Sequence, residues 1–146
     1  MKLNIKGIML QPQGPEALGW FKEPIKNMED FRDYTYRAPP GIPGQAYLDI
    51  GVDAVTMGGS EIFPALKSGT IDAAEWCCPL PDRIFGFQKV LKNYYLQGVH
   101  QNVVNSDLYI NGDLWKKIRP EHQKAIEIAA DASLIHTIAW RMHENG

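Results

Sequence analysis

EIFPALKSGTIDAAEW, residues 61–76, is the stretch that decides the fold. Apolar side chains recur at helical spacing through its first half, and Ser60 stands in front of them as the expected N-cap. Gly69 then occupies the place where a helix commonly ends in a left-handed residue. The run from residue 71 to residue 76 predicts a strand. A helix, a glycine cap and a strand are therefore expected in direct succession.

The same alternation extends outward over the whole chain. We expect strands over residues 1–10, 34–38, 54–57, 71–76 and 103–110, and helices over residues 27–33, 42–50, 61–68, 82–94, 112–118 and 120 to the C-terminus. We interpret residues 11–14 as a turn and residues 15–21 as loop or strand edge. The pattern predicts an α/β fold, a mixed sheet flanked by helices with a long C-terminal helix. In such folds ligands bind where loops follow the carboxyl ends of parallel strands.

The bulk composition is that of one folded domain. The chain has 146 residues, of which 45% are hydrophobic and 22% charged, so residues 1–146 are expected to form a single unit. A net charge of -2, with Lys and Arg scattered, argues against a nucleic-acid partner. The longest apolar stretches are far shorter than the roughly 20 residues of a membrane span. The alternating residues 1–10 do not predict a signal peptide.

None of the strongest catalytic motifs is found in the sequence. It has no phosphate-binding glycine loop, no Gly-x-Ser-x-Gly elbow and no His-Glu-x-x-His pair. Of the four histidines only His136 and His143 fall on one predicted helix, a spacing that we interpret as coincidence. The neighbours Cys77 and Cys78 could pair only through a strained ring, so buried thiols are expected. The chain is therefore not expected to be an enzyme.

Two short segments place side chains that could bind a ligand at the ends of predicted strands. Arg37 precedes a Pro-Pro-Gly turn, where a guanidinium can hold a carboxylate through two parallel hydrogen bonds. The alternative for Arg37 is a surface ion pair. Glu75 and Trp76 also end a strand, and an acid beside an indole there can bind a cation or a ligand hydroxyl.

The sequence also resembles a known family. The resemblance is carried by residues 61–76 and by Gly19-Trp20-Phe21, Tyr36-Arg37-Ala38-Pro39, Gly86-Phe87, Tyr94-Tyr95 and Leu108-Tyr109-Ile110-Asn111. In these segments the chain resembles the solute-binding subunits of tripartite ATP-independent periplasmic (TRAP) transporters, the DctP family. Members are periplasmic two-lobed clamps, longer than this chain, that bind organic acids and deliver them to a sodium-driven membrane permease. The resemblance implies that residues 1–146 form a single truncated lobe of such a clamp.

The resemblance further implies roles for particular residues. Arg37 matches the arginine that clamps the carboxylate, and Glu75 with the backbone of Trp76 matches positions that hold a bridging cation in the branch that binds 2-oxo acids. Trp20 fits the family pattern. Glu16 stands where that branch often has glutamine, so a Na⁺ or Ca²⁺ ion held by Glu16 and Glu75 would neutralise the extra carboxylate.

Near Gln101 or His100 the family commonly has an acid, and we include Gln101 among the expected ligand-binding residues. The expected function is thus the binding of a small organic acid, such as a 2-oxo acid, for a TRAP permease. The alternative is a self-associating truncated fragment with a vestigial pocket and no transport role. In either case we expect a homodimer, because a truncated lobe exposes apolar strips.

Overall fold

The structure, a computed structural model, describes residues 3–145, which form two compact units. The sheet unit comprises Pro15–Asn102, and the hairpin unit comprises the described residues up to Gly14 together with those from Val103 onward. The elements are β1 (Ile5–Gln13), β2 (Gly19–Phe21), α1 (Met28–Arg32), β3 (Thr35–Arg37), α2 (Ile42–Asp49), β4 (Asp53–Val55), α3 (Gly59–Ser68), β5 (Ala73–Ala74), α4 (Pro79–Phe85), the 3-10 turn η1 (Phe87–Lys89), β6 (Asn93–Tyr95), β7 (Val104–Asn111), α5 (Gly112–Lys117) and α6 (Pro120–Asn145). That residues 1–146 act as one lobe stays a prediction.

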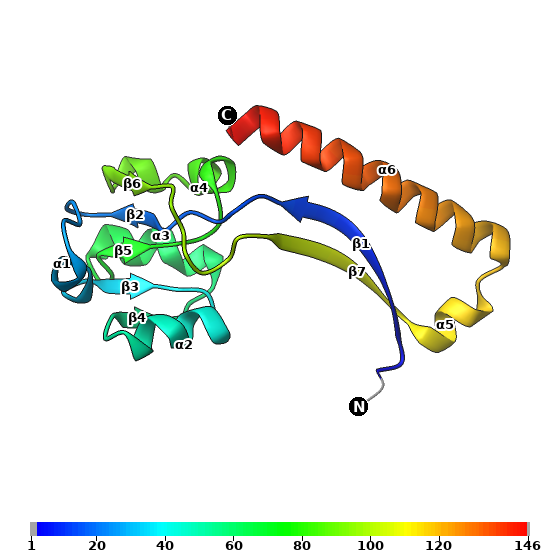
Figure 1. Ribbon diagram of the computed structural model, residues 1–146, viewed down its shortest axis with the longest axis horizontal. Helices are drawn as coiled ribbons and strands as arrows, with labels where there is room; N and C mark the ends of the chain where they lie inside the picture. The colour runs from blue at the N-terminus through cyan, green and yellow to red at the C-terminus, as the bar shows by residue number, and fades with distance from the viewer. Residues whose placement is uncertain (1–2, 146) are drawn as a thin grey trace. The chain divides into compact units, whose positions relative to one another are not determined.

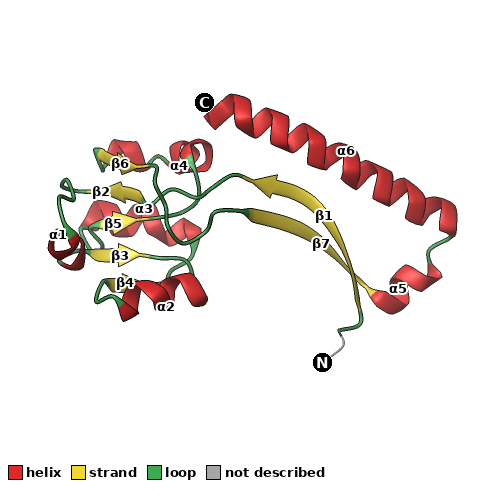
Figure 2. Ribbon diagram, in the orientation of Figure 1, coloured by secondary structure: helices red, strands yellow, loops and turns green. Residues whose placement is uncertain are grey.

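The sheet unit is built on five strands in the order β4-β3-β5-β2-β6 (Figure 1). Strand β3 pairs in parallel with both β4 and β5, whereas β2 runs antiparallel to β5 and to β6. Helices connect many of the strands along the chain and lie beside the sheet (Figure 2). The predicted α/β fold with a mixed sheet flanked by helices and a long C-terminal helix is confirmed.

Successive residues along the strands supply two separate apolar cores. Phe21 and Ala73 belong to a cluster with Tyr36, Phe31, Tyr47, Val52 and Ala38. Ala74, the next residue of β5, belongs to a second cluster with Ile62, Leu66, Ile71, Phe87 and Leu91. Because neighbouring side chains of a strand point to opposite faces, each face of the sheet carries its own core.

The hairpin unit pairs β1 with β7 in an antiparallel ribbon, with an irregularity in the register between Met9 and Gln11. Helix α6 packs along β1. Lys6 of β1 forms an ion pair with Glu127 of α6 at 2.9 Å, and its ammonium also lies 5.1 Å from the ring centroid of Trp115. These contacts fasten the long helix to the ribbon.

Several sequence-based expectations are confirmed at the level of single residues. Asn27 caps α1 by accepting a hydrogen bond from the backbone of Asp30 at 2.8 Å, and Gly69 ends α3 in the left-handed region. Strand β3 ends at Arg37, as predicted. Cys77 and Cys78 are both buried, with their sulfurs 3.2 Å apart.

Four expectations about the elements are wrong. The helix predicted over residues 82–94 is divided, because Gly86 adopts a φ of 83° that ends α4, and residues 93–95 form a strand. Residues 19–21 lie inside the sheet between two neighbours, where pairing outweighs their weak local pattern. The N-cap of α3 is Gly58, whose amide donates to the side chain of Glu61, in place of Ser60. Residues 11–13 extend β1 where a turn was expected.

Among residues 3–145, none of the helices combines the length and the apolar character needed to span a bilayer.

Phe21 belongs to the first core, so we expect the stability of the fold to depend strongly on its ring. Its ring is fully buried and packs against Phe31, Tyr34, Tyr36 and Tyr95 at centroid distances of 5.5–5.8 Å. We expect Phe21→Ala to lower the free energy of unfolding by about 3–5 kcal/mol, measured by urea denaturation. Ile84→Ala, at a side chain that is 74% exposed, is the control and should change it by less than about 0.5 kcal/mol. Equal losses in the two variants would contradict the proposed packing.

Candidate functional site

A buried ion pair lies at the carboxyl edge of two neighbouring parallel strands. Arg37 is the last residue of β3 and Glu75 follows directly after β5, so the pairing of the strands brings them together. Nη1 of Arg37 donates to Oε2 of Glu75 at 2.9 Å and also to the Glu75 carbonyl. The two side chains are only 5% and 0% exposed. The predicted meeting of positions 37 and 75 is therefore found in the structure.

Two loops add a second carboxylate and an imidazole to this pair. The backbone N–H of Glu16 donates to the carbonyl of Gln101 at 2.9 Å, which ties the segment before β2 to the loop after β6. Gly98 in that loop packs so closely that a Cβ would lie 2.0 Å from the Glu16 carbonyl oxygen. The loop thus needs glycine there in order to carry His100 to the site.

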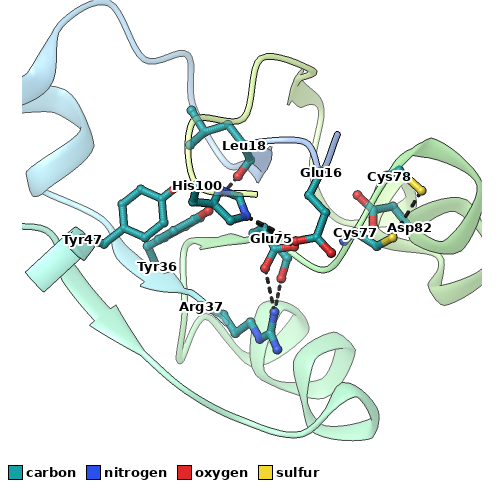
Figure 3. A network of polar contacts seen from close by, with 10 residues as sticks. All are labelled: Glu16, Leu18, Tyr36, Arg37, Tyr47, Glu75, Cys77, Cys78, Asp82 and His100. Carbon is teal, nitrogen blue, oxygen red and sulfur yellow. Dashed lines mark hydrogen bonds and ion pairs between the residues drawn. The ribbon is translucent and has the colours of Figure 1, made fainter. Parts of the chain in front are cut away.

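The side chains of Glu16, Glu75 and His100 turn toward a common point (Figure 3). Nε2 of His100 lies 3.4 Å from Oε2 of Glu16 and 4.0 Å from Oε1 of Glu75. One ligand atom from each of the three residues falls within 4.8 Å of the others. Oxygen and nitrogen donors at such separations can share one metal ion.

Tyr47 fixes the orientation of the imidazole. Its hydroxyl lies 2.8 Å from Nδ1 of His100, and the two rings meet edge to face with centroids 5.6 Å apart. Tyr47 itself packs against Tyr36, whose hydroxyl donates to the carbonyl of Leu18 at 2.8 Å. The ring nitrogen opposite Tyr47 therefore faces the two carboxylates.

Several buried polar atoms of this cluster have unused bonding capacity. Among the described residues, no hydrogen-bond partner meets Nε of Arg37, Oε1 of Glu75 or Nε2 of His100. Leaving such atoms unsatisfied costs about 1–3 kcal/mol each. An anion at the guanidinium and a cation between the carboxylates and the imidazole would satisfy all three, so these residues fit both kinds of ligand.

The electrostatics of the cluster favour the entry of positive charge. Burial and the neighbouring Glu16 carboxylate raise the pKa of Glu75 to about 8, although Arg37 opposes that shift. Burial likewise lowers the pKa of Arg37, and Glu75 offsets part of the effect. Glu75 thus takes up a proton more readily than an exposed glutamate, and a cation can take the place of that proton.

Trp20 and Trp76, the two tryptophans predicted to bind the ligand, lie in different surroundings. The ring centroid of Trp76 is 5.0 Å from the guanidinium carbon of Arg37, a cation–π contact, and Phe85 packs against the same ring. Trp20 instead stacks on Tyr94 with centroids 4.4 Å apart, and its Nε1 donates to Oδ2 of Asp82 at 3.1 Å. Trp76 therefore lies beside the ion pair, whereas Trp20 forms a hydrogen bond with Asp82.

Of the six predicted ligand-binding residues, Glu16, Arg37, Glu75 and Trp76 contribute side chains to one region. Gln101 contributes its backbone carbonyl. Their binding roles stay predictions. His100 and Tyr47 were missed as partners of the carboxylates, because loop geometry brings them together and no local sequence pattern carries that information. The neighbourhood of Gln101 was the only signal for His100.

Comparisons with known proteins identify the family of solute-binding proteins to which the chain belongs. The sequence model of the DctP family, bacterial extracellular solute-binding protein family 7, matches residues 1–144, and the chain belongs to that family. Members are periplasmic components of TRAP transporters that bind small organic acids and work with membrane permease subunits. The predicted family is thus confirmed.

Three relatives illustrate the similarity. The monocarboxylate 2-oxoacid-binding periplasmic protein of Nostoc sp. is 34% identical over 116 residues, which are 80% of this chain and 32% of that protein. A TRAP transporter solute-binding protein of Bordetella bronchiseptica, with calcium and picolinate, is 31% identical with a TM-score of 0.88, over 97% of this chain and 42% of its own. One from Pseudoalteromonas atlantica, with sodium and pyruvate, is 26% identical with a TM-score of 0.86, over 98% and 43%.

The chain spans about a third of the length of the curated relative, at 32%, and less than half of the two solved structures, at 42% and 43%. The similarity nevertheless includes almost all of this chain. Both units of the structure are therefore parts of the common fold of the family.

The raised pKa of Asp82 predicts a measurable pH dependence of stability. Burial raises it from 3.8 to about 7, although hydrogen bonds from Trp20 and Cys77 oppose the shift. Between these values the folded chain holds a proton that the unfolded chain has lost, so stability falls as pH rises from about 4 to 7. We expect Asp82→Asn to reduce this slope by up to about 1.4 kcal/mol per pH unit in urea unfolding experiments.

The matched control is Asp49→Asn, at an exposed carboxylate of α2 that accepts a hydrogen bond from Gln45. This control should leave the slope of stability against pH unchanged. Glu75, whose pKa is also raised, should contribute to the slope equally in both variants. Identical slopes in wild type and Asp82→Asn would show that Asp82 is ionised in the folded chain at pH 5–7.

Proposed function

We propose that the sheet unit binds a small organic monocarboxylate, such as a 2-oxo acid, as part of a periplasmic solute receptor that serves a TRAP permease. The single observation that carries this proposal is the guanidinium of Arg37. It is buried, it is fixed by Glu75 through Nη1, and its Nε has no hydrogen-bond partner among the described residues. A carboxylate oxygen at Nε would complete its hydrogen bonding.

A cation held by Glu16 and Glu75 completes the proposed site. Relatives of 31% and 26% identity bind calcium with picolinate and sodium with pyruvate. Picolinate and pyruvate both carry a carboxylate beside a second donor atom, so one ion can bridge ligand and protein. In this chain the cation would also offset the repulsion between the two carboxylates.

The proposed role is binding without catalysis. The chemistry of the site is that of a charge clamp, in which a guanidinium and a cation orient an anion. The sequence carries none of the strongest catalytic motifs. The bound acid would leave the site unchanged for transfer to the permease.

Arg37→Lys and Arg37→Ala test the carboxylate site. A dissociation constant near 1 μM corresponds to about 8 kcal/mol, and half of that energy leaves about 1 mM, so NMR titrations with pyruvate should extend to tens of millimolar. Removing one partner of a buried charged contact costs about 2–5 kcal/mol, which is at least about 30-fold in affinity. We therefore expect shifts that saturate in wild type and shifts that stay far from saturation in Arg37→Ala over the same pyruvate range.

Arg37→Lys keeps the charge but loses the planar fork, so it should fold and still bind at least about 10-fold more weakly. Arg119→Ala, at an exposed arginine paired with Glu121, is the control and should bind as wild type does. Pyruvate binding that survives in a folded Arg37→Ala variant would refute the proposal.

Self-association is the second candidate role, and apolar exposure favours it. Large side chains of α6 remain open to solvent: Ile128 is 57% exposed, Ile135 69%, Trp140 45% and Met142 73%. A related structure of 31% identity is described as a dimer. The proposed partner for this helix is a second copy of the chain.

We expect the molar mass measured by light scattering to approach that of a dimer at high micromolar concentration. Ile135→Glu and Met142→Glu should shift the equilibrium toward monomer by at least about 10-fold, because each would bury a charge. A monomeric mass at all concentrations would exclude self-association and leave the carboxylate proposal untouched.

A further inference from the structure

Beside the carboxylates of Glu16 and Glu75 lies a nitrogen donor, the imidazole of His100. Nε2 of His100 belongs to a side chain that is only 3% exposed, and Oε1 of Glu75 to one that is 0% exposed. Neither atom has a hydrogen-bond partner among the described residues, although the two are 4.0 Å apart. They point at a shared position without bonding to each other.

The two separations that involve His100 are close to those between two ligands of a small ion. Two donors of a tetrahedral zinc, each about 2.0–2.1 Å from the metal, lie roughly 3.3 Å apart. The 3.4 Å between His100 and Glu16 matches that value, and the 4.0 Å between His100 and Glu75 needs only a small side-chain rotation. A calcium ion takes six to eight oxygens at about 2.3–2.6 Å, and an imidazole nitrogen occupies one side of this site.

Tyr47 prepares the imidazole for metal binding. If Nδ1 of His100 donates its proton to the Tyr47 oxygen 2.8 Å away, Nε2 presents its lone pair to the carboxylates. Metal-bound histidines commonly have such a partner at the second nitrogen, which sets the tautomer and the ring orientation. Tyr47 is buried and held among aromatic rings, so this contact is rigid.

We propose that the cation of this site is a divalent transition-metal ion such as Zn²⁺, ligated by Glu16, Glu75 and His100, with a fourth position for the carboxylate ligand. The assignment rests on the proposed function for that fourth position. The three protein ligands are assigned from their own geometry and can be tested with the metal alone.

The charges of the cluster agree with a divalent ion. Two carboxylates against the guanidinium of Arg37 leave one negative charge. A divalent cation and a monocarboxylate together bring the cluster to neutrality, whereas a monovalent cation with the same ligand leaves it negative. Buried charge is costly unless it is balanced, so the divalent pairing is favoured over Na⁺. Between divalent ions, imidazole favours Zn²⁺ over Ca²⁺.

The test uses the 146-residue chain, treated with a chelator and then titrated calorimetrically with Zn²⁺, Ca²⁺ and Na⁺ in the absence of any carboxylate. We expect one equivalent of Zn²⁺ to bind at least about 100-fold more tightly than Ca²⁺. His100→Gln should weaken Zn²⁺ by at least about 30-fold and Ca²⁺ by less than about 3-fold. Tyr47→Phe should weaken Zn²⁺ by about 10-fold, as expected for the loss of a supporting contact.

His136→Gln is the control, because His136 is an exposed histidine of α6 outside the site. It should bind Zn²⁺ as wild type does, which would exclude His136 as the source of the Zn²⁺ binding. The d–d absorption of Co²⁺ gives a second readout in the wild-type chain. It should show a low-symmetry, four- or five-coordinate spectrum that is lost in His100→Gln.

Tighter binding of Ca²⁺ or Na⁺ than of Zn²⁺, or Zn²⁺ affinity that is unchanged in His100→Gln, would overturn the proposal. Repeating the titrations with pyruvate separates it from the proposed function. Pyruvate binding that requires Arg37 but is indifferent to Zn²⁺ and His100 would overturn the metal assignment alone. Zn²⁺ binding that depends on His100, without pyruvate binding under any ion, would support the metal site and refute the carboxylate function.

Discussion

The buried pair of Arg37 and Glu75 is the interaction on which the site depends. Taking two charges out of water costs several kcal/mol each, and only close geometry with extra hydrogen bonds repays that cost. Here the parallel pairing of β3 with β5 supplies the geometry, since Arg37 ends one strand and Glu75 follows the other. The same guanidinium nitrogen also reaches the Glu75 carbonyl. The sheet register and the ion pair therefore define each other.

Glu16 and His100 make this pair into a candidate binding site. Without them the cluster would be neutral and closed, but the second carboxylate leaves it one positive charge short. The close approach of Gly98 to Glu16 and the Glu16–Gln101 hydrogen bond hold both residues in place before any ligand arrives. Such preorganisation lowers the entropy lost when a ligand binds, because few side chains must then be ordered.

The sequence predicted the layout better than the contacts. Arg37 and Glu75 could be placed at one edge because strand periodicity and the rule for parallel sheets are local signals. The helix predicted through Tyr94 was wrong, since apolar spacing cannot distinguish a helix from two short elements divided at Gly86. Strand β2 was missed because its three residues owe their conformation to β5 and β6. His100 joined the site through a loop whose path depends on tertiary packing.

The repulsion between the buried Glu16 and Glu75 carboxylates affects both the stability of the fold and the binding of a cation. Two buried carboxylates with one guanidinium favour a bound proton on Glu75, as its pKa of about 8 reflects. A cation that displaces this proton binds only the folded arrangement, because the unfolded chain scatters the three donors. Its binding energy therefore adds to the stability of the fold, in proportion to the logarithm of its concentration. Under the proposed function, a cation bound at this cluster would therefore couple the stability of the fold to the binding of the ligand.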